Sequence, residues 1–123
     1  MKKSKQFTNN SLTIQVVEHE DSIEVKWEGK SVDREPSVFI SPILIKVLEM
    51  AGDLNKRIIM DFQSMSYMNS STITPIIKIL DRAKKGMTKI TIFYQKSLKW
   101  QELNFSALKI FKTKDNRLEI KGL

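Results

Sequence analysis

The sequence has 123 residues, enough for one domain with a single core, and its hydrophobic content of 41% and charged content of 28% are typical of a globular protein. It contains no cysteine, which excludes disulfides and thiolate metal sites and suits a reducing cytoplasm, and no apolar run approaches the roughly 20 residues of a membrane helix. The formal net charge of +7 would suit an anionic partner, but lysines that solubilise helix faces are the simpler explanation.

The first part of the chain is predicted to contain a tail and a hairpin. Residues 1–10 begin with basic side chains but lack the apolar stretch of a signal peptide, so they are predicted to form a flexible basic N-terminal tail, and residues 11–123 the folded domain. Apolar and polar side chains alternate between residues 12 and 27, which is typical of a β-hairpin. His19 lies at its tip, where a solvated turn residue is a simpler interpretation than a metal ligand.

Helices and strands alternate over the rest of the chain. A helix is predicted over 41–52, because Ser41 can cap its N-terminus, Pro42 suits its first position and Gly52 suits its end. The short apolar run RIIMDF predicts a central strand buried on both sides. The remaining predicted elements are a helix ending at Gly86, a strand over 88–95, a helix over 97–111 with a break near 104–106, and an edge strand over 117–122.

This order of elements predicts an α/β fold in a single domain. Strands separated by helices favour parallel pairing with right-handed crossovers, and the opening hairpin adds an antiparallel part. We therefore expect a small mixed sheet of four to five strands packed with about three α-helices.

A cluster of polar side chains stands where the second helix begins. Asn69, Ser70 and Ser71 form the turn, and Pro75 fits the first helical turn, where a backbone donor would have no partner. The cluster can be a redundant N-cap, since Asn and Ser side chains accept hydrogen bonds from free N–H groups. It can also be a phosphorylation site, because a helix N-terminus stabilises an anion, whereas a docked partner would have to desolvate the added charge.

The segment RIIMDFQSMSYMNSS (57–71) resembles the core signature of STAS domains, the fold of anti-sigma factor antagonists. In that family an aspartate-serine-serine-glycine turn follows the third strand and its first serine is phosphorylated; Ser70 falls on that serine. The order of elements over 12–111 is also similar. The sequence departs from the pattern at Asn69, which replaces the aspartate, and at Thr72, which replaces the glycine.

A second resemblance is to SiaC-type biofilm-regulation phosphoproteins, a STAS-like family. Four residues of the segment EGKSVDREPSVFISPI have the spacing of that family: Gly29, Ser31, Phe39 and Pro42. The family's phosphorylated turn is asparagine-threonine-serine-serine, which is similar to the Asn-Ser-Ser-Thr of residues 69–72. The run Asp33-Arg34-Glu35 replaces the family's proline-glutamate-asparagine, so the resemblance leaves the partner open.

These resemblances imply a non-enzymatic, cytoplasmic signalling phosphoprotein of bacteria that acts in partner switching and, by the SiaC-type likeness, in biofilm regulation. A Ser/Thr protein kinase of the histidine-kinase-like type would phosphorylate Ser70, with Ser71 and Thr72 as secondary candidates, and a PP2C-type phosphatase would reverse this. The unphosphorylated form would bind a target protein such as an anti-sigma kinase or a diguanylate cyclase. The expected partner-binding residues surround the turn: Gly29, Ser31, Asp33, Glu35, Ser66, Tyr67, Asn69, Ser70, Ser71 and Thr72.

Two other functions stay open on the sequence: a plain protein-interaction module without phosphorylation, and a basic nucleic-acid-binding module that uses Lys78, Lys84, Lys85 and Lys89. The second is not favoured, because no helix-turn-helix or RNA-binding signature is present. The glycines are isolated and no nucleophile–base pair is recognisable, so we expect no catalytic residue, no metal and no cofactor. Asp61 is expected to form a cap or loop hydrogen bond, and Trp100 to pack in the core.

Overall fold

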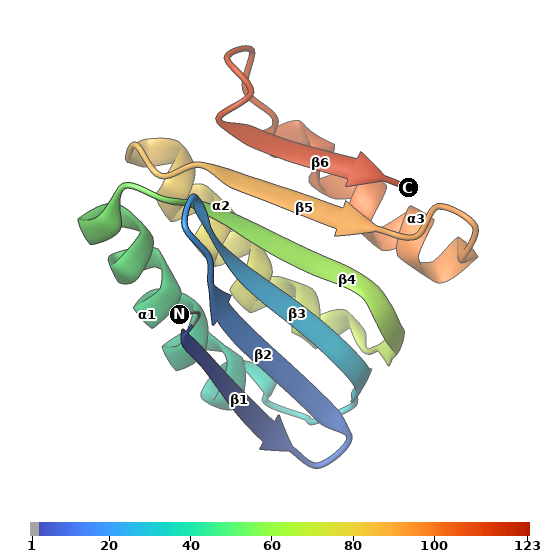
Figure 1. The fold of residues 1–123 in the computed structure, drawn as a ribbon. Coiled ribbons are helices and arrows are strands. Elements are labelled where there is room, and N and C mark those ends of the chain that lie inside the picture. Colours follow the sequence, from blue (N-terminus) through green and yellow to red (C-terminus); the bar gives the residue numbers. More distant parts are fainter. Residues whose placement is uncertain (1–2) are drawn as a thin grey trace.

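The computed structural model describes residues 3–123, which form a six-stranded sheet and three α-helices (Figure 1). The strands are β1 (Lys3–Asn9), β2 (Leu12–Glu18), β3 (Ser22–Ser31), β4 (Arg57–Met68), β5 (Ile90–Tyr94) and β6 (Leu118–Gly122). The helices are α1 (Pro36–Leu54), α2 (Ile73–Lys85) and α3 (Lys99–Ser106), with the 3₁₀ turns η1 (Ser70–Thr72) and η2 (Ala107–Phe111). The predicted α/β class with a mixed sheet is confirmed, with one strand more than expected.

The strands lie in the sheet in the order in which they occur in the chain. The pairs β1–β2 and β2–β3 are antiparallel, and β3–β4, β4–β5 and β5–β6 are parallel. A helix connects the two strands of each parallel pair, as expected for crossovers between parallel neighbours (Figure 1). Because the parallel strands run in one direction, the turns that follow β3, β4 and β5 all lie at the same end of the sheet.

The extra strand comes from the segment that was predicted to be a flexible tail. Residues 3–9 pair with β2 along their whole length, from Lys3 opposite Glu18 to Asn9 opposite Leu12, and residues 1–2 of the predicted tail lie outside the described residues. Asn10, with φ of 55°, makes the tight turn between the two strands. The prediction was wrong because Phe7 is the one apolar side chain in the strand, so the alternation that indicates a strand is almost absent.

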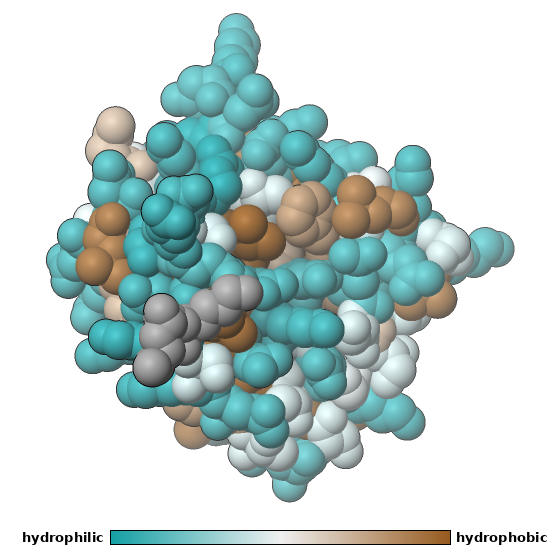
Figure 2. All heavy atoms as spheres, viewed as in Figure 1, coloured by the Kyte–Doolittle hydropathy of each residue, from teal (hydrophilic) through white to brown (hydrophobic). Residues whose placement is uncertain are grey.

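All three helices pack on one face of the sheet, and the other face is open. Along β4 the side chains of Ile58, Met60 and Phe62 are fully buried, whereas Ile59 and Asp61 on the opposite face are only half-buried. The prediction that this strand is buried on both sides is therefore wrong: Ile59 makes the apolar run look continuous although it lies on the open face. Figure 2 shows this open face, which is mostly hydrophilic with a few apolar patches.

The helix boundaries agree with the sequence except in α1. That helix begins at Pro36 and ends at the left-handed cap Asn55, so Pro42 and Gly52, predicted to mark its limits, both lie inside it. Pro36 occupies the favourable first position, and a second proline in a helix interior removes only one backbone hydrogen bond when packing holds the helix. Gly86 ends α2 as predicted. In residues 3–123, none of the helices is long and apolar enough to cross a membrane.

An aromatic cluster fixes the carboxyl ends of the strands against α3. Ring centroids of Trp27 and Phe62 lie 4.7 Å apart, and those of Phe62 and Phe105 lie 4.5 Å apart. Tyr94 stacks on Phe105 at 5.8 Å, and Trp100 packs at the edge of the same cluster, as predicted. Buried aromatic side chains therefore pack tightly at the end of the sheet that carries the strand-to-helix turns.

Candidate functional site

The turn between β4 and α2 is built around the side chain of Asn69. Its backbone is extended, and its Oδ1 accepts hydrogen bonds from the backbone N–H of Thr72 (3.2 Å) and from the Thr72 hydroxyl (2.7 Å). This is the geometry of an N-cap that serves the 3₁₀ turn leading into α2. The cap predicted from the sequence is present, but one residue, Asn69, supplies it.

The same residue joins the turn to the loop that follows β3. The Asn69 backbone N–H donates to the carbonyl of Ser31 (2.9 Å), and its Nδ2 donates to the carbonyl of Asp33 (2.7 Å). The hydroxyls of Ser31 and Thr72 are hydrogen-bonded to each other at 2.6 Å inside the protein. Two segments far apart in the sequence therefore form one unit, as the combined resemblances of 28–43 and 57–71 imply.

Asp33 extends this unit to the β1–β2 turn. Its carboxylate accepts hydrogen bonds from Nδ2 of Asn9 and from Nδ2 of Asn10, the latter at 2.9 Å. Asn9 and Asn10 were not among the predicted site residues, because both belong to the segment that was predicted to be a tail. A run of two asparagines before an alternating segment was the available signal for a tight turn.

Gly29 has a structural reason to be glycine. Its φ is +89°, and a Cβ at this position would lie 2.1 Å from the carbonyl oxygen of Ser11. The pairing of β3 with β4 is irregular just after it, and the hydroxyl of Ser66 donates to its carbonyl at 3.2 Å. Only glycine fits this close approach, so Gly29 shapes the backbone next to the turn.

The predicted partner-binding residues divide into a buried, a partly buried and an exposed set. Ser31 and Thr72 are 3% and 0% exposed, so their side chains are not available to a partner or to a kinase in this conformation; they hold the turn together from inside. Gly29, Asp33 and Asn69 are partly buried and form the framework described above. The exposed members are Glu35, Ser66, Tyr67, Ser70 and Ser71.

Two apolar side chains that the sequence did not assign to the site are exposed on elements that adjoin the turn. Val32 in the β3–α1 loop is 51% exposed, and Ile77 on α2, which helical spacing assigns to the core, is 37% exposed. Tyr67, which is among the predicted partner-binding residues, is 48% exposed. These three side chains give the surface beside the turn an apolar component, which is common where proteins dock.

The hydroxyl of Ser70, like that of Ser71, is not part of this network, in contrast to the side chains of Asn69 and Thr72. Ser70 is exposed at the first position of η1, and within the described part of the chain no group forms a hydrogen bond to its hydroxyl. The first turns of η1 and α2 contain no acidic residue. A negative charge added to Ser70 would therefore meet the positive end of a helix without a like charge in its first turn.

The other candidates lie away from this site or have local roles. His19 is at the opposite end of the sheet, where its Nε2 contacts Glu24 Oε1 at 3.0 Å. The Asp61 carboxylate accepts hydrogen bonds from the backbone and side-chain nitrogens of Gln63, a local bond as expected, although it lies within β4 and not in a cap or loop. Among residues 3–123, no cluster of three or more His, Cys, Asp or Glu side chains could hold a metal ion.

Comparison with known proteins supports the fold. No family model and no curated protein matches the sequence. Among solved structures, the chain is similar to an anti-sigma factor antagonist from Mycobacterium paratuberculosis, with a TM-score of 0.65 and 13% sequence identity over 89% of this chain and 93% of that one. At this identity the similarity establishes a shared fold, and the STAS-like architecture predicted from the sequence is thereby confirmed.

Proposed function

We propose that this protein is a non-enzymatic signalling phosphoprotein that switches between partners through reversible phosphorylation of Ser70. The observation that carries the proposal is the contrast within the turn: Ser70 and Ser71 have free, exposed hydroxyls, while Asn69, Thr72 and Ser31 hydrogen-bond to one another beside them. Of the two serines, Ser70 is the one that the resemblance aligns with the phosphorylated residue. A phosphoryl group can therefore be added without breaking any of the hydrogen bonds that form the turn.

The consequences of phosphorylation differ for the fold and for a partner. A phosphoserine brings roughly −1.5 to −2 charges, which the N-terminal end of α2 favours. A protein docked over the turn would cover the exposed Val32, Tyr67 and Ile77 and exclude water there. Burying a doubly charged group in that contact costs several kcal/mol, by order of magnitude, unless the partner supplies a matching cation. Phosphorylation would thus release the partner and leave the fold intact.

The expected partners follow from the resemblances and from the fold shared with an anti-sigma factor antagonist. A histidine-kinase-like Ser/Thr kinase would modify Ser70, and a PP2C-type phosphatase would restore it, in the cytoplasm of a bacterium. The target of the unphosphorylated form would be an anti-sigma kinase or, by the SiaC-type likeness, a diguanylate cyclase in biofilm regulation. Ser71 is the alternative acceptor, since its side chain is also exposed.

The proposal is tested by mapping phosphate on the protein purified from cells that naturally produce it, and by comparing variants as bait. We expect mass spectrometry to find phosphate on Ser70. We also expect to isolate one protein that binds both the wild type and Ser70→Ala, and that binds Ser70→Asp at least about tenfold more weakly, a loss of about 1.4 kcal/mol or more in binding free energy. Ser97→Asp, at an exposed serine after β5, is the matched control and should retain the target. Equal binding by Ser70→Asp and the wild type, or unchanged phosphorylation of Ser70→Ala, would overturn the proposal.

A further inference from the structure

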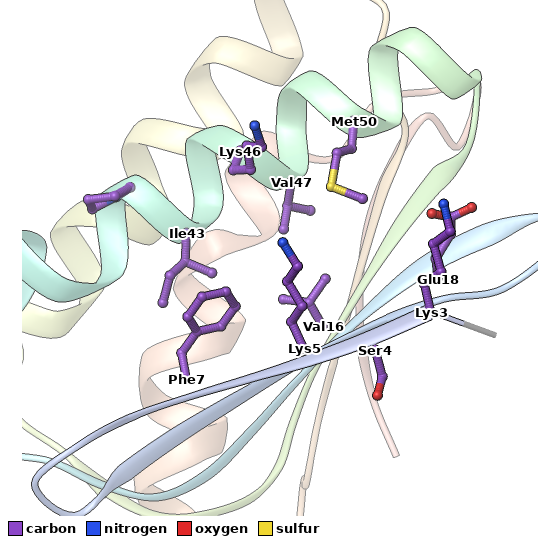
Figure 3. Close-up of a pocket in the computed structure, with 11 residues that line it drawn as sticks. Lys3, Ser4, Lys5, Phe7, Val16, Glu18, Ile43, Lys46, Val47 and Met50 are labelled. Carbon is purple, nitrogen blue, oxygen red and sulfur yellow. The ribbon is translucent and has the colours of Figure 1, made fainter.

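A groove with a volume of about 800 Å³ lies between α1 and the first two strands (Figure 3). Its apolar lining comes from Phe7 on β1, Val16 on β2, and Ile43, Val47 and Met50 on α1. This volume lies within the range of small-molecule sites, about 300 to 1,000 Å³. The groove does not include the Ser70 turn, so an inference about it is independent of the proposed function.

The groove is elongated along α1. Ile43, Val47 and Met50 are spaced by four and three residues, so they line one stripe of the helix about 10 Å long. Lys5 and Phe7 are two residues apart on β1 and therefore point to the same side, toward α1, as Figure 3 shows. An extended apolar chain fits such a trough better than a rounded ring system does.

The charge of the groove is positive. Lys3 and Lys5 from β1 and Lys46 from α1 line it, and Figure 3 shows the ammonium group of Lys5 directed across the groove toward α1. Within residues 3–123 none of these three lysines forms an ion pair. The carboxylate of Glu18 at one end does not offset them, because it is paired with Lys56 at 3.1 Å.

Protection of the sheet edge explains these lysines only in part. Charged side chains that point inward on an edge strand prevent other strands from pairing with it, and Lys3 and Lys5 stand on the edge strand β1. Lys46 is on the helix on the other side of the groove and cannot serve that purpose. Lys3 and Lys5 above an apolar floor suit a ligand with an apolar chain and an anionic end, and Lys46, whose ammonium group points away from β1 in Figure 3, adds positive charge at the α1 rim.

We propose that this groove binds a single-chain fatty carboxylate, with the chain along Phe7, Ile43 and Val47 and the carboxylate among the lysines. The groove is concave, whereas a membrane surface requires a flat or convex patch. The occupant follows from the pairing of an apolar floor with three lysines that form no ion pair within residues 3–123.

Titration of the isotopically labelled protein with dodecanoate below its micellar concentration, followed by NMR, tests this proposal. We expect saturable shifts of the backbone amides of Phe7, Val16 and Val47, and no shift at Ser70. Lys5→Glu should weaken dodecanoate binding about tenfold, since it removes one attraction and adds one repulsion. Lys5→Met keeps the apolar stem of the side chain and removes only the charge, so it is a second variant in case Lys5→Glu does not fold. It should weaken dodecanoate binding about threefold.

Two controls test whether binding depends on the carboxylate of the ligand and on the position of the lysine. Dodecanol should bind more weakly than dodecanoate and should be insensitive to Lys5→Glu. Lys109→Glu, which reverses an exposed lysine on η2, should bind dodecanoate like the wild type. The proposal is overturned if dodecanoate causes no saturable shifts, if Lys5→Glu binds it unchanged, or if phosphatidylglycerol vesicles or an acidic glutamate-leucine peptide bind through Lys5 while dodecanoate does not.

Discussion

Two strand-to-helix junctions at the same end of the sheet each present an exposed serine, and they are held in different ways. After β4, Asn69 precedes the helix and caps it from outside, and Ser70 is left without a structural hydrogen bond. After β5, Leu98 stands at the cap position without a side-chain hydrogen bond, and the hydroxyl of Ser97 accepts one from Gln95 Nε2 (3.1 Å).

The second junction is held from inside by Gln101. This fully buried side chain accepts a hydrogen bond from the backbone N–H of Gln95 at 2.7 Å and donates to the carbonyls of Phe62 and Met65 at 2.9 and 3.0 Å. Two of its three bonds connect α3 to β4, and the third holds the backbone of the residue that follows β5. Under the proposed function, an exposed serine after a strand serves as a switch only where its hydroxyl makes no hydrogen bond to its own turn, which is the case for Ser70 and not for Ser97.

Replacement of Gln101 tests the internal support and should have the largest effect. Gln101→Ala leaves the carbonyls of Phe62 and Met65 and the N–H of Gln95 without partners in a dry environment, so the free energy of unfolding should fall by about 3 kcal/mol. Denaturant unfolding measures it. A loss below about 1 kcal/mol would mean that water replaces the amide and that this junction is not held from inside.

Replacement of Asn69 tests the external support. Asn69→Ala removes the cap and the bond to the Asp33 carbonyl, and we expect a loss of about 1 to 2 kcal/mol in the free energy of unfolding. Asn69→Asp keeps the cap acceptor and should lose less. Asn104→Ala, which removes one bond to the Trp100 carbonyl of its own helix, is the matched control and should cost less than Asn69→Ala.

At alkaline pH, the free energy of unfolding should depend on the ionisation of a tyrosine at the β5 junction. Burial, and to a smaller extent Glu102, raises the pKa of Tyr94, the last residue of β5. Since the folded state favours the neutral phenol, its contribution to stability is complete below the unfolded pKa of about 10 and is lost as the pH rises through the folded pKa. Tyr94→Phe should change the free energy of unfolding by less than about 1 kcal/mol at pH 7. Above pH 10, the free energy of unfolding of Tyr94→Phe should decrease less steeply with pH than that of the wild type, as measured by denaturant unfolding.

The two serines themselves should have the smallest effect on stability. Ser70→Asp and Ser97→Asp both place a charge on an exposed side chain, and each should change the free energy of unfolding by less than about 0.5 kcal/mol. Only Ser70→Asp should affect binding of the target. If its melting temperature drops by several degrees while that of Ser97→Asp does not, Ser70 has a structural role after all.

The sequence predicted the class and order of the elements because periodicity reports burial directly. The hairpin, the α2 turn and the limit at Gly86 agree with the structure. The misses have physical reasons: β1 has a single apolar side chain, and two prolines could each begin α1. Ile59 lies on the open face, where an apolar side chain conceals the alternation of β4.

The candidate site was predictable in its location but not in the roles of its members. Spacing and resemblance placed Ser70 at a strand-to-helix turn, which the structure has. Residue type could not tell that Thr72 and Ser31 are buried partners of each other, because that depends on how two segments 41 residues apart meet. The involvement of Asn9 and Asn10 depends on β1, so it was lost with that strand.

The agreement between strand order and chain order has a consequence for how the protein can be made. As the chain leaves the ribosome, each new strand can pair with the free edge of the strand before it. No existing strand pair has to separate for a later strand to insert between its members. The two antiparallel pairs close short loops first, which limits the time for which their unpaired edges are exposed. A sheet built by successive addition can therefore assemble during synthesis, with the turn after β4 completed before the last two strands exist.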